Sequence, residues 1–141
     1  MRAKYYLKQL KKLDLMINNK LIEKEQWKTI AMGTTARADG DRVQSSGSKQ
    51  KMADAIDRYV DIEKEIDSVI DRLVDTKQDV ISVIEQLEPP EYDLLHKVYV
   101  QYMSLSDVAA MEDKSYSLIT TIHGNALKHV QIIMNEREKH E

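Results

Sequence analysis

The sequence predicts an all-α protein: a long antiparallel helical hairpin (a coiled coil) followed by a smaller C-terminal domain of three helices. Two observations carry this prediction. Charged residues make up 32% of the 141 residues, which suits long solvated helices. Leu, Ile, Val and Met recur at helical spacings, while the chain has no Phe and only two Pro. This length fits one domain, or a compact unit with an appendage.

The first helix is expected over residues 3–31. Its apolar stripe follows a 4-3-4-4 spacing through Tyr6, Leu10, Leu13, Ile17 and Leu21. Gly33 should end this helix. Residues 32–49 contain three Gly and several Ser and Thr, so we expect a flexible loop there.

The second helix, from about residue 50 to 88, has the clearest pattern. Its a and d positions step 3-4-3-4 through Met52, Ala55, Tyr59, Ile62, Ile66, Val69, Leu73, Thr76, Val80, Val83 and Leu87. Further apolar residues widen this stripe, which indicates more than one neighbouring helix. We expect a homodimer whose contacts include Tyr59, Ile62, Ile66, Val69, Leu73 and Val80. The alternative is a monomer whose C-terminal segment covers this face.

Charge is distributed unevenly along the two long helices. Residues 1–31 carry eight basic and three acidic residues, whereas residues 51–88 carry five basic and eleven acidic ones. The simplest interpretation is that the two helices lie side by side and neutralise each other. In the alternative, the cations of the first helix, Lys4, Lys8, Lys11 and Lys12, face outward and contact phosphate.

A Pro-Pro pair divides the chain into two predicted domains. Pro89 cannot continue the second helix, and Pro90 suits the first turn of the next helix. We therefore expect a hairpin domain over residues 1–88 and a C-terminal domain over residues 89–141.

The C-terminal domain has the pattern of a helix-turn-helix. Ser104 is a candidate N-cap, with Asp107 three residues later, and a short helix should follow. Ser115 is a second candidate N-cap, after the turn "EDK". The longer last helix would then turn its inner face through Leu118, Ile119, Ile122, Ala126, Leu127 and Val130. A short helix, a tight turn and a longer helix fit this motif.

This segment also resembles a known family. Its pattern includes "YVQY" at residues 99–102, Leu105, Ser115, and the ending "IHGNAL" at residues 122–127. It is similar to region 4 of bacterial sigma factors, and its ending to small phage and prophage proteins of the ArpU and RinA group of late-transcription regulators. The segment "VQSSGSKQKMADAIDRYVDIEKEIDSVID" extends the likeness upstream.

The resemblance implies a regulator of phage transcription that binds double-stranded promoter DNA in a bacterial cytoplasm. It implies a recognition helix whose DNA-binding residues are Ser115, Tyr116, Ser117, Thr120, Thr121, Asn125 and Lys128. This helix has no Arg or Lys before Lys128, although cations supply the commonest base contact and most phosphate affinity. RNA polymerase, or dimerisation, could supply the missing affinity.

Two other functions stay open. One is a protein-interaction module that has the helix-turn-helix shape without DNA binding, which the shortage of cations favours. The other is a phage packaging component of the small-terminase type, which would assemble as a ring rather than a dimer.

No enzymatic site is evident in the sequence. Cys is absent, and no paired carboxylates or Ser/His/Asp set stands out, so we expect neither an enzyme nor a metal or cofactor. His123 is interpreted as a packed or hydrogen-bonded structural residue. No window approaches the roughly 20 apolar residues that span a bilayer, so no membrane partner is expected.

Overall fold

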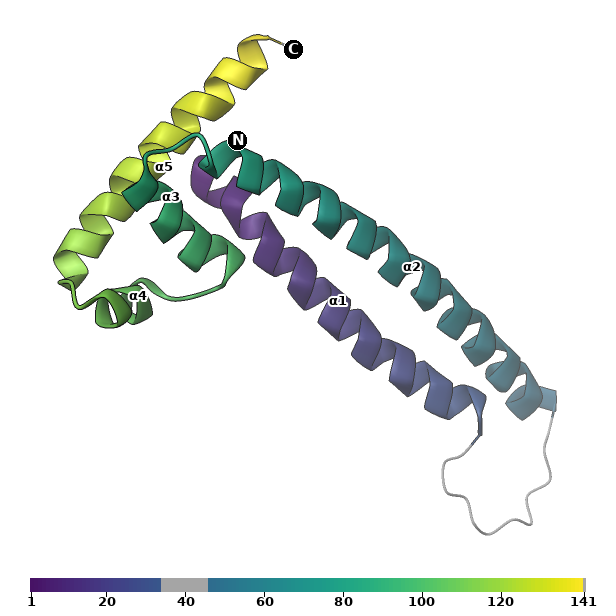
Figure 1. Cartoon of the computed structure of the whole chain (residues 1–141). Coiled ribbons are helices and arrows are strands. Elements are labelled where there is room, and N and C mark those ends of the chain that lie inside the picture. The colour runs from purple at the N-terminus through teal and green to yellow at the C-terminus, as the bar shows by residue number, and fades with distance from the viewer. Residues whose placement is uncertain (34–45, 141) are drawn as a thin grey trace. The chain divides into compact units, whose positions relative to one another are not determined.

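The computed structural model describes residues 1–33 and 46–140, and throughout these residues it is all-helical. The elements are α1 (Ala3–Ala31), α2 (Ser46–Ile84), α3 (Pro89–Leu95), the π-helix η1 (His96–Val100), α4 (Leu105–Glu112) and α5 (Tyr116–Lys139) (Figure 1). The predicted all-α class is confirmed.

Two compact units divide the chain. Unit 1 combines Met1–Leu13 with Leu73–Glu141, and unit 2 is Asp14–Arg72. The first turns of α1 and the end of α2 therefore belong to the same unit as α3, α4 and α5. This division is not the one that the Pro-Pro pair predicts. The two units describe how the folded chain packs. The predicted domain boundary after Glu88 concerns which parts fold independently, and it stays a prediction.

The core of unit 1 draws on four parts of the sequence. Its buried residues are Ala3, Tyr6, Leu7, Leu10, Val80, Val83, Ile84, Leu95, Tyr99, Ala126, Val130 and Met134. The start of α1 is also tied to α5 by a hydrogen bond, because the backbone N–H of Ala3 donates to Oε1 of Gln131 over 2.8 Å. The N-terminal residues are thus an integral part of the unit that contains α4 and α5.

Polar contacts around the Asp79 carboxylate join α1, α2 and α5 within unit 1. The Tyr6 hydroxyl of α1 donates to the Asp79 carboxylate of α2. The Arg137 guanidinium of α5 donates to that carboxylate through Nη2, 2.8 Å from Oδ1. The hydrogen bond from Arg137 is the main cause of the lowered pKa of Asp79. The arrangement leaves Asp79 ionised and paired, so it holds the three helices together.

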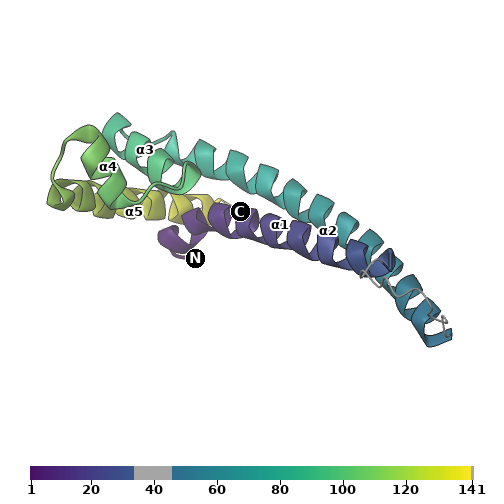
Figure 2. The same cartoon turned by 90° about the horizontal axis from the view of Figure 1, so that it is seen from below.

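Unit 2 consists of segments of α1 and α2 that lie side by side in both views (Figures 1 and 2). Lys20 pairs with Glu65 over 3.0 Å, and Lys24 with Glu63 over 3.3 Å. The acidic partner on α2 moves from residue 65 to residue 63 as the lysine on α1 moves from residue 20 to residue 24, so the two segments run antiparallel. One predicted core residue is wrong: Leu21 is 45% exposed. Lys20 and Lys24 lie toward α2 instead, where their ammonium groups reach acidic partners.

The ends of the long helices follow from local chemistry. Gly33 has φ +61°, a left-handed conformation that glycine adopts without strain, and its N–H donates to the carbonyl of Ile30. The predicted break at Gly33 is confirmed. The loop predicted over residues 32–49 is too long at its far end, because α2 already begins at Ser46. The rest of that prediction, residues 34–45, lies outside the described part of the chain.

The residues predicted to form the oligomer interface take part in packing within the chain. Ile62, Ile66, Val69 and Val80 are buried, and Tyr59 and Leu73 are partly buried. The large apolar residues that α2 leaves exposed are Ile56, Val60, Ile70 and Val74. These exposed residues lie beside the predicted stripe, and the homodimer stays a prediction.

Candidate nucleic-acid interface

The helices α4 and α5 are positioned by a small apolar cluster of their own. Leu94 of α3, Val108 and Ala109 of α4, and Ile119 of α5 are buried against one another. Each residue lies on the buried side of its helix. This cluster fixes α4 against the first two turns of α5, which is the part of the chain that the sequence assigns to DNA binding.

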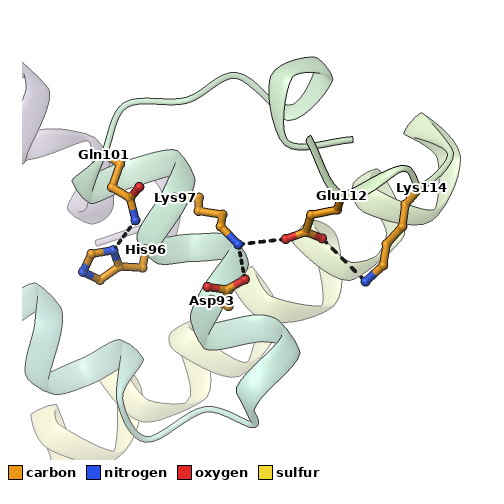
Figure 3. A network of polar contacts seen from close by, with 6 residues as sticks. All are labelled: Asp93, His96, Lys97, Gln101, Glu112 and Lys114. Carbon is orange, nitrogen blue, oxygen red and sulfur yellow. Dashed lines mark hydrogen bonds and ion pairs between the residues drawn. The ribbon is translucent and has the colours of Figure 1, made fainter. Parts of the chain in front are cut away.

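The connection from α3 to α4 is irregular in a way that the sequence did not indicate. Five residues, His96–Val100, form a π-helix, and Tyr102 follows with φ +62°. The backbone N–H of Met103 donates to the carbonyl of Lys97 over 2.9 Å. The Gln101 side chain forms a hydrogen bond of 2.8 Å with His96 Nδ1 (Figure 3). These bonds stabilise a sharp change of chain direction just before α4.

A network of charged groups ties α4 to this connection. Lys97 donates to Asp93 one turn earlier and, over 2.9 Å, to Glu112 at the end of α4 (Figure 3). Glu112 also pairs with Lys114, 3.5 Å away. Hydrogen bonds from Lys97 to Asp93 and then to Glu112 raise the pKa of Lys97. Both lysines are thus engaged with carboxylates beside the turn that joins α4 to α5.

Both α4 and α5 begin at a serine N-cap. Ser104 Oγ accepts a hydrogen bond from the Asp107 N–H, and Ser115 Oγ accepts one from the Leu118 N–H, each over 3.0 Å. Both predicted N-caps are confirmed. Asp113 ends α4 in the left-handed conformation, φ 54°, and its N–H points to the carbonyls of Ala109 and Ala110.

The structure places all seven predicted DNA-binding residues on exposed positions along α5 or at its cap. They are Ser115, Tyr116, Ser117, Thr120, Thr121, Asn125 and Lys128. One part of the predicted inner face is wrong: Leu118 is 46% exposed, because it lies one residue before the buried Ile119. Met111 of α4 is 55% exposed. The exposed side of α4 and α5 is therefore mixed polar and apolar.

The two threonines of α5 have their hydroxyl protons directed at the helix backbone. Thr120 Oγ1 donates to the carbonyl of Tyr116, and Thr121 Oγ1 donates to that of Ser117 over 2.9 Å. A hydroxyl has one proton, so each threonine in this conformation can only accept a further hydrogen bond. Amino groups of adenine and cytosine donate in the major groove, whereas phosphate oxygens only accept. This geometry suits contacts with bases rather than with phosphates.

His123 is buried on the inner side of α5, with only 9% of its surface exposed. Its Nε2 lies 2.7 Å from the Tyr99 hydroxyl. This position agrees with the interpretation of His123 as a hydrogen-bonded structural residue. In residues 1–33 and 46–140, no group of three or more His, Asp or Glu side chains is placed to hold a metal ion.

Comparison with known proteins adds no identification. No protein-family model matches the chain, and no curated protein or solved structure is significantly similar to it. Among the helices that the structure describes, none combines the length and the apolar character needed to cross a membrane.

Proposed function

We propose that the chain is a transcription regulator that binds double-stranded DNA through a helix-turn-helix made by α4 and α5. The observation that carries this proposal is the pair of N-capped helices joined by a three-residue turn, with exposed hydroxyl, amide and phenol groups along the first turns of α5. Helices presented in this way can enter the major groove. The resemblance to sigma region 4 and to the ArpU and RinA regulators supports the same function, in a bacterial cytoplasm and without enzymatic activity.

Within this proposal, the threonines of α5 read bases. Thr120 and Thr121 would accept hydrogen bonds from adenine N6 or cytosine N4, because their own protons are used within the helix. Tyr116 is 55% exposed at the start of α5 and can donate through its hydroxyl. Asn125 and Lys128, further along α5, would contact phosphate.

The helical pair of α1 and α2 would serve dimerisation. Two copies of one recognition helix would bind two half-sites as one unit, which raises affinity without any new contact in either half. RNA polymerase could supply affinity in the same manner, by holding the promoter that the regulator reads.

The test is a selection from a pool of random duplexes, with and without bacterial RNA polymerase, followed by sequencing of the retained DNA. We expect one enriched motif, with one base pair strongly preferred at the position that Thr121 contacts. Thr121→Val removes the hydroxyl but keeps the shape, so it should lose that preference, whereas Thr121→Ser should retain it. A motif that is identical for both variants would contradict this role of Thr121.

A second function, an interaction module without DNA binding, is favoured by one observation. Met111 and Leu118 expose apolar surface on α4 and α5, which suits a protein partner better than a phosphate backbone. Failure to retain any DNA, at low salt and with polymerase present, would favour this function. A ring-shaped oligomer in solution would instead favour the packaging component.

A further inference from the structure

The positive charge of unit 1 is concentrated on the first turns of α1. Residues 1–13 contain five basic residues and no acidic ones: Arg2, Lys4, Lys8, Lys11 and Lys12. All five are exposed. No ion pair within residues 1–33 and 46–140 joins any of them to a carboxylate. The expected neutralisation by the acidic α2 therefore holds for Lys20 and Lys24 but not for this cluster.

Most cations in α3, η1, α4 and α5 differ in this respect. Lys97 and Lys114 pair with Glu112, Arg137 pairs with Asp79, and Lys139 pairs with Glu136. Their charges are largely cancelled by their neighbours. The cluster on α1 is thus the main source of unpaired positive charge in unit 1. In the sequence it precedes α4 by about 100 residues.

Geometry brings part of this cluster next to α4. Lys8 and Lys11 line a cleft of about 210 Å³ together with Tyr102, Met103 and Ser104, the residues that lead into α4. Lys4, Lys8 and Lys11 follow a spacing of four and three residues, so they share one side of α1. Seven residues of helix span about 10 Å, a length comparable with three base-pair steps of about 3.4 Å along the axis of a DNA duplex.

We propose that Lys4, Lys8, Lys11 and Lys12, here called the α1 cation stripe, bind the phosphate backbone of the DNA that α5 reads. This inference rests on the proposed function and supplies what the recognition helix lacks. Phosphate contacts give affinity without sequence preference, while contacts from α5 give preference with little affinity. An anionic membrane is a poorer fit, because the apolar side of these turns, including Leu7 and Leu10, is buried in the core.

The test measures the affinity of the full chain for fluorescent 30-base-pair duplexes across a range of NaCl concentrations. Each phosphate contact contributes about −0.9 to the slope of log affinity against log salt. We expect the double variant Lys8→Gln, Lys11→Gln to make this slope less negative by about 1.8 and to weaken binding to every duplex by a similar factor. The matched control is Lys28→Gln, Lys64→Gln, which makes the same change of net charge at exposed positions of unit 2.

The outcomes separate this inference from the proposed function. The α1 cation stripe would be overturned if the two double variants had equal effects on DNA binding. It would also be overturned if Lys8→Gln, Lys11→Gln had no effect. The recognition helix would stand in either case, provided that Thr121→Val still alters the motif. Loss of slope with no effect of the threonine variants would support the stripe and overturn base reading. No binding by the unaltered chain would overturn both. Lysine-dependent sedimentation with phosphatidylserine vesicles, in place of DNA binding, would assign the stripe to a membrane and overturn the proposal.

Discussion

The hydroxyl of Tyr99 in η1 lies 2.7 Å from Nε2 of His123 in α5, and the two rings stack with their centroids 5.7 Å apart. Burial, and then the charge of Lys4, lower the pKa of His123. Burial also raises the pKa of Tyr99 to about 12. Both side chains are therefore uncharged at neutral pH, and together they fasten the π-helix to α5.

The first prediction is that stability falls as the solution becomes acidic. The unfolded chain takes up a proton on His123 near the ordinary pKa of about 6.5, whereas the folded chain takes it up only at lower pH. The contribution of neutral His123 is therefore fully present above about pH 6.5 and is lost as the pH falls below it. Thermal unfolding at several pH values should show this decline. It should be smaller in His123→Gln, and unchanged in His140→Gln, which alters an exposed histidine. Equal declines in both variants would contradict the role of His123.

The second prediction concerns the contact between Tyr6 and Asp79. Tyr6→Phe removes one hydrogen bond to a carboxylate that Arg137 also holds, so the free energy of unfolding should fall by about 1 to 2 kcal/mol. Tyr5→Phe is the matched control, since Tyr5 is the neighbouring residue and is 58% exposed. Urea unfolding measures both. The prediction is wrong if the two variants lose the same stability.

The third prediction is that Gly124→Ala stabilises the protein. Gly124 lies within α5, and a Cβ atom placed there would meet nothing within 4 Å. Alanine is favoured over glycine inside a helix by about 0.5 to 1 kcal/mol, mainly because the unfolded glycine is more flexible. The melting temperature should therefore rise. A lowered melting temperature would show that α5 needs a glycine at this position.

The fourth prediction concerns the turn between α4 and α5. Asp113 adopts φ 54°, which glycine reaches without the steric cost that other residues carry. Asp113→Gly should raise the free energy of unfolding by a few tenths of a kcal/mol to about 1 kcal/mol. Asp113→Ala removes the same charge but keeps the Cβ atom, so it should give no such gain. Similar gains from both variants would assign the effect to charge rather than to conformation.

The sequence predicts the helices well where local patterns decide them. Ser104, Ser115 and Gly33 mark helix ends by the hydrogen bonds and backbone angles that these residue types favour. It predicts less well which side of a helix is buried when polar residues have long stems. Lys20 and Lys24 occupy the side of α1 that faces α2, at the expense of Leu21, because their charged ends reach Glu65 and Glu63.

Other features depend on contacts between distant segments, and no local pattern shows these. The π-helix at residues 96–100 carries no distinctive residues, and the bond between Lys97 and Glu112 joins residues that are 15 positions apart. The position of the α1 cation stripe beside α4 also follows from tertiary packing. The sequence shows the positive charge of this stripe, but it does not show that Tyr102, Met103 and Ser104 lie beside it.

The N–H of Ala3 and the side chain of Gln131, which are bonded in the folded chain, are separated by 128 residues. Seven of the twelve residues in the same core precede residue 89. During synthesis, the apolar side of α1 must therefore lack some of its final neighbours until α5 has left the ribosome. Contacts between residues so far apart in the sequence form late, because the cost of closing the intervening chain comes before the contacts compensate for it. The core of unit 1 can therefore be completed only after α5 has been synthesised.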